Sequence, residues 1–239
     1  MPPTAARIPV EERLILALDV PSWTEAKTLV ERLGDSVRFY KIGLELATTR
    51  DYFALLDWLL ARDKRVFCDL KLYDIPATVG AAVRQISRSG ASFLTVHGEL
   101  SVMRAAAENK GEGLAVLAVT VLTSLGQSDL AASGITMDVD ALTLMRAKQA
   151  VDCGCDGVIA SGLEAGRLRA ELGPEPLIVT PGIRPASGAG RDDQKRVATA
   201  ESALRAGADY IVVGRPIREA ADPTAATRSL QREIAAAFA

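Results

Sequence analysis

An acid and a base stand two residues apart within residues 66–76, where an apolar strand pattern acquires charge. The acid is Asp69 and the base is Lys71. Because residues two apart in a strand project from the same face, we expect the carboxylate and the ammonium group to lie side by side. Asp74 follows in a loop, and Pro76 suits the first position of a helix, where its missing amide is not needed. The alternative interpretation is a solvated ion pair at the end of a strand.

This stretch belongs to a pattern that repeats along the chain, in which a short apolar run precedes a helix-forming segment. Eight runs are expected as strands, at residues 14–19, 38–43, 65–70, 92–97, 114–121, 157–161, 177–181 and 210–214. Strands that are apolar on both faces and alternate with helices favour a parallel sheet covered by helices, and a count of eight favours closure. An open doubly wound sheet is the alternative, but no G-x-G-x-x-G motif follows the first run.

The sequence therefore predicts an α/β protein with a (β/α)8 TIM barrel that forms a single domain over residues 1–239, with residues 1–12 as a short N-terminal extension. Ser22 is expected to cap a helix over residues 24–33, and a second helix is expected over residues 76–88. The composition, 49% hydrophobic and 24% charged, is that of a globular protein with a sizeable core.

Charge and composition limit the class of ligand. The formal net charge is −2 and Lys and Arg are spread along the chain, so we expect no nucleic-acid surface and no membrane surface. No apolar run approaches the roughly 20 residues of a membrane span, and residues 1–13 lack the apolar core of a secretory signal, so a cytoplasmic location is expected. Three cysteines and the single histidine, His97, form no metal-binding pattern, and we expect no metal.

In a barrel of this kind the active site lies at the C-terminal ends of the strands. Polar residues expected there are Asp19, Lys41, Asp69, Lys71, His97, Thr120, Thr123, Ser124, Arg184 and Arg215. Lys41 comes from the strand next to Asp69 and Lys71, which predicts a cluster whose charges alternate in sign. Adjacent carboxylates favour the charged form of a lysine, which makes it a proton donor. The alternative is a structural ion-pair cluster, and His97 is interpreted as a hydrogen-bonded structural residue.

The loops after the seventh and eighth strands are where such barrels commonly bind phosphate. They carry Arg184 and the pair Gly214-Arg215, and glycine admits backbone amides to an anion while arginine offers a planar fork of donors. The loop over 185–194 lies where a lid would, and Gln194 at its far end would add a neutral donor. These features predict a phosphorylated small molecule as ligand; a Gly-Arg turn that only caps a helix is the alternative.

Three hydroxyl residues close the fifth strand, Thr120, Thr123 and Ser124. Their hydroxyl groups both donate and accept hydrogen bonds, which suits a polar ring such as a pyrimidine. Turn capping is the alternative role.

Seven segments together resemble the orotidine 5′-monophosphate decarboxylase family over nearly the whole chain. They are residues 16–19, 39–43, 69–76, 120–124, 181–185, 192–194 and 213–216. The joint match is highly specific, whereas the Asp69-x-Lys71-x-x-Asp74 pattern alone is shared by related barrel enzymes. The resemblance implies decarboxylation of orotidine monophosphate to uridine monophosphate without a metal or cofactor, the last step of pyrimidine nucleotide synthesis.

The resemblance also implies roles for single residues. Lys71 is expected to protonate C6 of the pyrimidine, beside the departing carboxylate that Asp69 faces. Asp74 and Ile75 are expected to reach into the neighbouring subunit's site, so that a homodimer shares two sites. Lys41 and Asp74 are expected to complete a catalytic network with Asp69 and Lys71. Other substrate contacts are expected from Asp19 and Lys41 at the ribose, from Thr78 and Thr123, from Ser124 at the pyrimidine amide edge, and from Arg184, Gln194, Gly214 and Arg215 at the phosphate.

Departures from the family pattern occur at Cys68, Tyr73, Ala77 and Gly98, none of which is assigned chemistry. The closest alternative enzyme is 3-keto-L-gulonate 6-phosphate decarboxylase, which resembles a magnesium-dependent, enolate-forming enzyme. That enzyme is expected to carry an acid at the position of Lys41. The ammonium group of Lys41 would repel a magnesium ion. A non-catalytic barrel that binds a phosphorylated nucleotide is the alternative from another class, but it has no need of a buried Asp69 and Lys71.

Overall fold

Eight parallel strands close into a barrel in the computed structural model, which describes residues 8–184 and 196–238. The strands pair in sequence order, and β8 pairs with β1 to close the ring. They are β1 (Leu14–Ala17), β2 (Phe39–Gly43), β3 (Arg65–Leu72), β4 (Phe93–His97), β5 (Ala115–Val119), β6 (Gly157–Ile159), β7 (Leu177–Thr180) and β8 (Tyr210–Val213). The prediction of a (β/α)8 barrel is confirmed.

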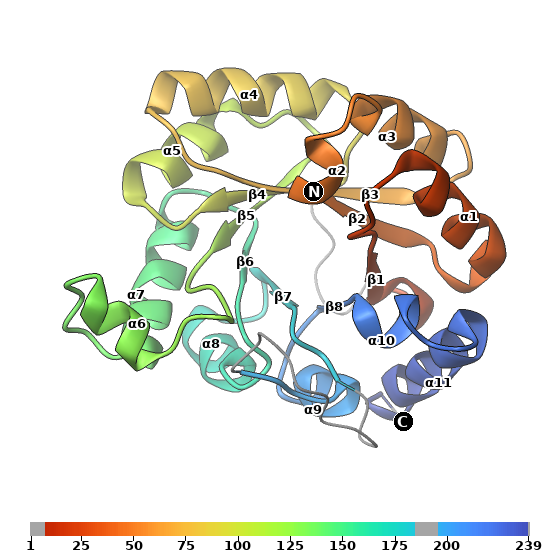
Figure 1. Cartoon of the computed structure of the whole chain (residues 1–239). Coiled ribbons are helices and arrows are strands. Elements are labelled where there is room, and N and C mark those ends of the chain that lie inside the picture. Colours follow the sequence, from red (N-terminus) through yellow and green to blue (C-terminus); the bar gives the residue numbers. More distant parts are fainter. Residues whose placement is uncertain (1–7, 185–195, 239) are drawn as a thin grey trace.

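Helices surround the ring of strands (Figure 1). They are η2 (Val10–Glu12), α1 (Trp23–Leu33), η3 (Gly34–Ser36), α2 (Leu44–Ala47), α3 (Tyr52–Leu60), α4 (Pro76–Arg88), α5 (Leu100–Asn109), α6 (Gln127–Ala132), α7 (Val139–Asp152), α8 (Ala165–Leu172), α9 (Ala200–Arg205), α10 (Arg215–Arg218) and α11 (Pro223–Ala236). Ser22 caps α1 by accepting a hydrogen bond from the amide of Glu25 at 3.2 Å, and Pro76 begins α4, both as predicted. Within the described residues, none of the helices has the length and apolar character needed to cross a membrane.

Two apolar layers hold the barrel together. Alternate residues of each strand face outward and pack against the helices, as Leu16, Tyr40 and Leu94 do. The other residues face inward and form a second cluster, in which Phe39, Phe67, Phe93 and Tyr210 are the largest members. This division follows from the period of two along a strand.

The inward positions change from apolar to polar toward the C-terminal ends of the first strands. Two residues beyond the inward Ala17, Phe39, Phe67 and Phe93 come Asp19, Lys41, Asp69 and Thr95. Four polar side chains from four neighbouring strands therefore meet at one end of the barrel, while the aromatic rings fill its interior below them.

Candidate active site

The third strand is irregular where it carries its charges. Between Cys68 and Leu72 it advances four residues, while its neighbour β4 advances only from Leu94 to Val96. Lys71 lies in this bulge with φ at +47°, a left-handed conformation that costs a residue with a side chain roughly 1–2 kcal/mol. The strand accordingly extends to Leu72, two residues beyond the predicted end. Strain of this kind concentrates at functional sites because bulges re-aim side chains there.

Four charged side chains form a continuous chain across the mouth of the barrel. The Nζ atom of Lys41 lies 2.9 Å from Oδ1 of Asp19 and 3.2 Å from Oδ2 of Asp69. On its other oxygen, Asp69 accepts a hydrogen bond from Nζ of Lys71 at 2.8 Å. The alternation in sign of Lys41, Asp69 and Lys71 was predicted from the sequence, whereas the place of Asp19 at the end of the chain was not. Asp69 and Lys71 meet within the bulge of β3 rather than on a regular strand.

Burial and charge act against each other on the two central members. Burial alone would lower the pKa of Lys41, but the carboxylates of Asp69 and Asp19 outweigh it, and the pKa is raised. Burial would likewise raise the pKa of Asp69, but the charges of Lys41 and Lys71 outweigh it, and the pKa is lowered. Both groups are therefore charged at neutral pH. The two end members are more exposed, at 43% for Asp19 and 31% for Lys71, than the central Lys41 and Asp69 at 10% and 12%, so the chain is buried at its middle and open to the cavity at both ends.

Thr95 is a member of this site that the sequence analysis did not identify. Its hydroxyl donates to Oδ1 of Asp69 at 2.8 Å and accepts from the backbone amide of Lys71 at 3.0 Å. It therefore fixes both the acid and the backbone of the strained lysine. The available signal was a single threonine at an inward position in the otherwise apolar run Phe93-Leu94-Thr95-Val96.

Gly43 leaves the space that the first two members of the charge chain need. A Cβ atom at this position would lie 3.1 Å from Nζ of Lys41 and 3.4 Å from Oδ1 of Asp19, tighter than ordinary contact for the first. A larger residue would therefore press on the ion pair.

A cavity of about 300 Å³ opens above the charged chain. The predicted site residues that line it are Asp19, Lys41, Asp69, Lys71, Thr123, Ser124, Arg184, Gly214 and Arg215. Apolar walls come from β1, β3, β5, β6 and β8 at Ala17, Phe67, Val119, Ile159 and Val212. The size and the mixed lining are those of a small-molecule site.

Cationic side chains outnumber carboxylates in this lining. Among the described residues it contains five cations and two carboxylates, and three of the cations are arginines on the side of β7 and β8. Arg184 and Arg215 were predicted, whereas Arg218, one helical turn beyond Arg215 on α10, was not. The arrangement favours an anionic ligand whose most charged end lies near the arginines.

Three predicted residues do not line the cavity in this single chain. Asp74, Ile75 and Thr78 are exposed at the start of α4. Oδ1 of Asp74 accepts a hydrogen bond from the amide of Ile75 at 2.6 Å, and this carboxylate forms no ion pair with a described residue. The predicted lid over 185–194 and Gln194 lie outside the described residues.

His97 takes no part in the cavity. Its ring packs against Tyr73 with ring centres 4.6 Å apart and planes tilted by 37°, and it is partly buried. The prediction that it is hydrogen-bonded is wrong for Nδ1, which is buried without a partner. Packing, rather than a hydrogen bond, holds the ring. Among the described residues, no group of three or more His, Cys, Asp or Glu side chains is placed to hold a metal ion.

Chemically, the site presents one ammonium group to a cavity that recognises anions. Lys71 offers a proton and a positive charge, Asp69 and Thr95 fix its position, and the arginines attract a second charge across the cavity. A fixed charge in a partly dry site stabilises a developing negative charge far better than water does. The geometry fits a reaction in which a carbanion forms beside Lys71.

Comparison with known proteins identifies one family over nearly the whole chain. Residues 12–230 match the model of the orotidine 5′-phosphate decarboxylase / HUMPS family. A relative from Methylococcus capsulatus named orotidine 5′-phosphate decarboxylase is 59% identical, covering 97% of this chain and 96% of its own. One with the same name from Xanthomonas euvesicatoria is 53% identical, covering 95% and 93%. The crystal structure of orotidine 5′-phosphate decarboxylase from Lactobacillus acidophilus superposes with a TM-score of 0.80 at 32% identity, covering 93% and 99%.

Proposed function

We propose that this chain, which belongs to the orotidine 5′-phosphate decarboxylase / HUMPS family, is an enzyme that converts orotidine 5′-monophosphate into uridine 5′-monophosphate and carbon dioxide in pyrimidine nucleotide biosynthesis. The observation that carries the proposal is the contact between Lys71 and Asp69 at 2.8 Å on the wall of an anion-binding cavity. Relatives of that name match over nearly the full length of the chain, which supports the same substrate.

The proposed chemistry needs one proton and one fixed charge. When the bond between C6 and the carboxylate carbon breaks, its electron pair stays on C6 in the plane of the ring, where the π system does not delocalise it. The Lys71 ammonium group stabilises that charge and then donates its proton to C6. Asp69 lies beside the carboxylate that leaves as neutral carbon dioxide, so the repulsion between these two negative groups is relieved as the electron pair moves to C6. Water returns a proton to Lys71 after product release.

The remaining contacts orient the substrate. We assign Asp19 and Lys41 to the ribose hydroxyls, and Thr123 and Ser124 to the pyrimidine. Arg184, Gly214 and Arg215 line the part of the cavity that suits the phosphate, with Gln194 assigned to the same group by sequence. Because remote contacts supply energy that orders the reacting end, phosphate binding is expected to increase the rate as well as the affinity.

Lys41 argues against the magnesium-dependent branch of related enzymes. A hard cation needs oxygen ligands, and here an ammonium group contacts both Asp19 and Asp69, which would otherwise be the nearest carboxylates. We therefore propose that the reaction proceeds without a metal or other cofactor. Full activity on orotidine monophosphate in excess chelator is the expected result, and a strict magnesium requirement would contradict it.

The direct test removes the proposed proton donor. Orotidine monophosphate consumption is followed by absorbance with the parent protein, with Lys71→Ala and with Lys110→Ala. Lys71→Ala is expected to lower kcat/KM by at least about 10³-fold. Lys110 is a matched control because its Nζ also pairs with an aspartate, Asp156 at 2.6 Å, outside the cavity. A parent protein that binds but never consumes the substrate would be a non-catalytic nucleotide-binding barrel, and equal rates for both variants would overturn the role of Lys71.

We further propose a homodimer in which the loop at Asp74 completes the partner's site. The support is an exposed apolar surface beside that loop, where consecutive elements after β2, β3 and β4 place Leu44, Tyr73, Ile75 and Leu100 in solvent. The exposed fraction of Ile75 reaches 66%, and such clustered apolar side chains are typical of protein interfaces. Asp74 forms no ion pair within its own described chain.

Mixing two inactive variants tests the shared site. Lys71→Ala and Asp74→Ala are each expected to be nearly inactive. If Asp74 acts across the interface, a heterodimer of the two has one intact site, and an equal mixture regains about a quarter of the parent activity. If Asp74 acts within its own chain, mixing restores nothing, and the shared-site proposal fails.

The cytoplasm is the proposed location. Cys68, Cys153 and Cys155 all have free thiols, as is usual where the environment is reducing. A charged nucleotide substrate also does not cross a membrane unaided. Fractionation with an activity assay checks this, and activity confined to a secreted or membrane fraction would contradict it.

A further inference from the structure

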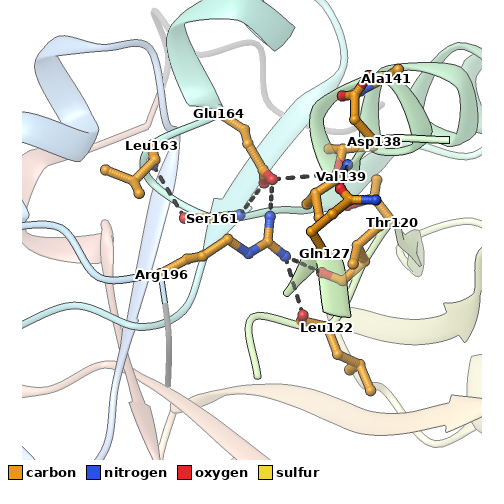
Figure 2. Close-up of polar contacts among 12 residues, drawn as sticks. Thr120, Leu122, Gln127, Asp138, Val139, Ala141, Ser161, Leu163, Glu164 and Arg196 are labelled. Carbon is orange, nitrogen blue, oxygen red and sulfur yellow. Dashed lines mark hydrogen bonds and ion pairs between the residues drawn. The ribbon is translucent and has the colours of Figure 1, made fainter. Parts of the chain in front are cut away.

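Two arginines hold three consecutive backbone carbonyls just before the residues assigned to the pyrimidine. Arg146 of α7 donates from Nη1 to the carbonyl of Thr120 at 2.7 Å. Arg196 donates from Nη2 to the carbonyls of Val121 and Leu122, each at 3.1 Å. Figure 2 shows the Arg196 guanidinium group lying between Leu122 on one side and Glu164 on the other. The backbone leading into Thr123 is therefore fixed by side chains from elsewhere in the chain.

The other side of Arg196 is fixed as firmly. Its Nη1 pairs with Oε1 of Glu164, which also accepts from the hydroxyl of Thr143 at 3.3 Å. Oε2 of Glu164 accepts from the backbone amide of Ser161 at 2.8 Å. The Arg196 and Glu164 side chains are 13% and 7% exposed. Arg196 thus links the segments that follow β5, β6 and β7, and its planar fork makes these contacts at once.

Besides the two arginines, one backbone hydrogen bond holds this segment, from the amide of Leu125 to the carbonyl of Leu122 at 2.9 Å, which closes a turn around Thr123 and Ser124. Thr123 and Ser124 line the cavity directly after the three held carbonyls. Neither hydroxyl forms a hydrogen bond with another described residue, so their positions depend on the backbone that carries them. A shift of that backbone moves both hydroxyl groups relative to any ring in the cavity.

We propose that Arg196 is a positioning residue that holds Thr123 and Ser124 at the pyrimidine edge of the substrate. This inference rests on the proposed function, because it takes the pyrimidine to lie against those two residues. Arg196 does not line the cavity and does not touch the substrate; it acts through the carbonyls of Val121 and Leu122.

A purely structural role is the alternative, and the chain offers a matched control for it. Arg169 pairs with Asp209 at 2.6 Å and also donates to backbone carbonyls, those of Gly173, Pro176 and Gly207. This second arginine lies at the other end of the barrel, before β7 and β8. Both sites combine a buried carboxylate with several carbonyls, but only Arg196 adjoins the cavity wall.

The test replaces each arginine by lysine. A lysine keeps the charge that the carboxylate needs, but its single ammonium group does not reproduce the planar fork. We expect Arg196→Lys to lower kcat/KM for orotidine monophosphate by about 10- to 100-fold, the effect of moving contact groups by up to 1 Å. Arg169→Lys is expected to change it by less than about twofold, although both variants lose thermal stability.

Ligand binding separates positioning from general loosening. Uridine monophosphate and ribose 5-phosphate share the phosphate and the ribose, but only the nucleotide has a pyrimidine edge. In calorimetry, Arg196→Lys is expected to lower the affinity for uridine monophosphate about tenfold, roughly the effect of losing one hydrogen bond. Its affinity for ribose 5-phosphate is expected to stay unchanged.

Each other outcome identifies what has failed. Equal weakening of both ligands, or unchanged kcat/KM in Arg196→Lys, overturns the positioning role while the parent still consumes orotidine monophosphate. A parent protein without that activity overturns the proposed function instead. A double-mutant cycle with Ser124→Ala gives a second check. Arg196→Lys is expected to reduce the affinity for uridine monophosphate less in the Ser124→Ala variant than in the parent protein, because the hydroxyl that Arg196 positions is already absent.

Discussion

Both ends of this barrel contain buried ion pairs, but the two ends hold their carboxylates differently. At the N-terminal end, Asp156 and Asp209 each stand one residue before a strand. Each accepts a backbone amide of the neighbouring strand, Val116 at 2.8 Å and Ile178 at 2.7 Å. Each is also paired with one cation, Lys110 or Arg169. These carboxylates tie one strand to the next.

At the C-terminal end, Asp69 is held only by side chains. It contacts the ammonium groups of Lys41 and Lys71 and the hydroxyl of Thr95, and it lines a cavity. A carboxylate bonded to strand backbone stabilises the sheet, whereas one bonded to two lysine side chains that line a cavity positions them for a ligand. Burial and ion pairing therefore do not by themselves identify a catalytic charge, whereas the groups that hold the charge do.

Aromatic packing at the N-terminal end supports the same division. The guanidinium group of Arg65 lies 4.3 Å above the ring of Phe39 and pairs with Glu12 at 3.1 Å. Phe93 and Tyr210 pack edge to face, with ring centres 5.2 Å apart. Aromatic rings and the paired Arg65 side chain fill the barrel at this end. The N-terminal end therefore stabilises the strands that carry the charged residues at the other end.

The largest expected effect comes from Asp69→Asn. The amide keeps the shape of the carboxylate but removes the charge between Lys41 and Lys71, so the alternating chain is interrupted. We expect kcat/KM for orotidine monophosphate to fall roughly 10³-fold, as when one preorganised electrostatic group is lost. The measurement is steady-state kinetics together with denaturant unfolding. A variant that keeps its activity but unfolds readily would show that Asp69 supports the fold, as Asp156 and Asp209 do, and not the reaction.

The same substitution at the other end, Asp209→Asn, is expected to act on stability instead. Asp209 is 1% exposed, and removing its charge leaves the Arg169 guanidinium group with neutral acceptors, among them the carbonyls of Gly173, Pro176 and Gly207. The free energy of unfolding is expected to fall by about 2 kcal/mol, the loss of a hydrogen bond between charged groups, because the cost of burying the Asp209 charge offsets part of the ion pair. Under conditions where the variant is folded, kcat is expected to match the parent. A loss of kcat there would show that the two ends are coupled.

The sequence predicted the barrel and most of the charge chain because both depend on regular features. Period-two alternation placed Asp69 inward, and the adjacency of consecutive strands placed Lys41 beside it. The phosphate side followed because loops after β7 and β8 share one end of any such barrel, which brought Arg184 and Arg215 to one cavity.

The rest depends on contacts that no local pattern contains. The bulge that gives Lys71 a positive φ arises from the pairing of β3 with β4, and it is this pairing that makes Thr95 a partner of both Asp69 and Lys71. Arg196 is one arginine among many in the sequence until the fold brings it to Glu164 and two carbonyls. The roles of Asp74 and Ile75 stay predictions, because they concern a second subunit. The ligand contact of Thr78 also stays a prediction, because Thr78 does not line the cavity of its own chain.

The smallest expected effect is a difference in pH dependence between the two ends. Burial would raise the pKa of Asp69, but Lys41 and Lys71 outweigh it and the pKa is lowered. Burial also raises the pKa of Asp209, and there the amide of Ile178 and the charge of Arg169 do not overcome it, so the pKa stays raised. The shifts are opposite, so the two carboxylates affect stability with opposite signs.

Ionised Asp69 stabilises the fold above its unfolded pKa of about 3.9, and that contribution is lost as the pH falls through its lower folded pKa. Ionised Asp209 costs stability above its raised folded pKa, and that cost disappears as the pH falls toward about 3.9. Denaturant unfolding of the parent and of each Asp→Asn variant between neutral pH and pH 3 measures both. We expect the parent's advantage over Asp69→Asn to shrink only at the acid end of this range. The difference in free energy of unfolding between the parent and Asp209→Asn is expected to grow in the parent's favour as the pH falls from neutral to the unfolded pKa. If the differences for the two variants changed in the same direction with pH, both ends would hold their carboxylates alike.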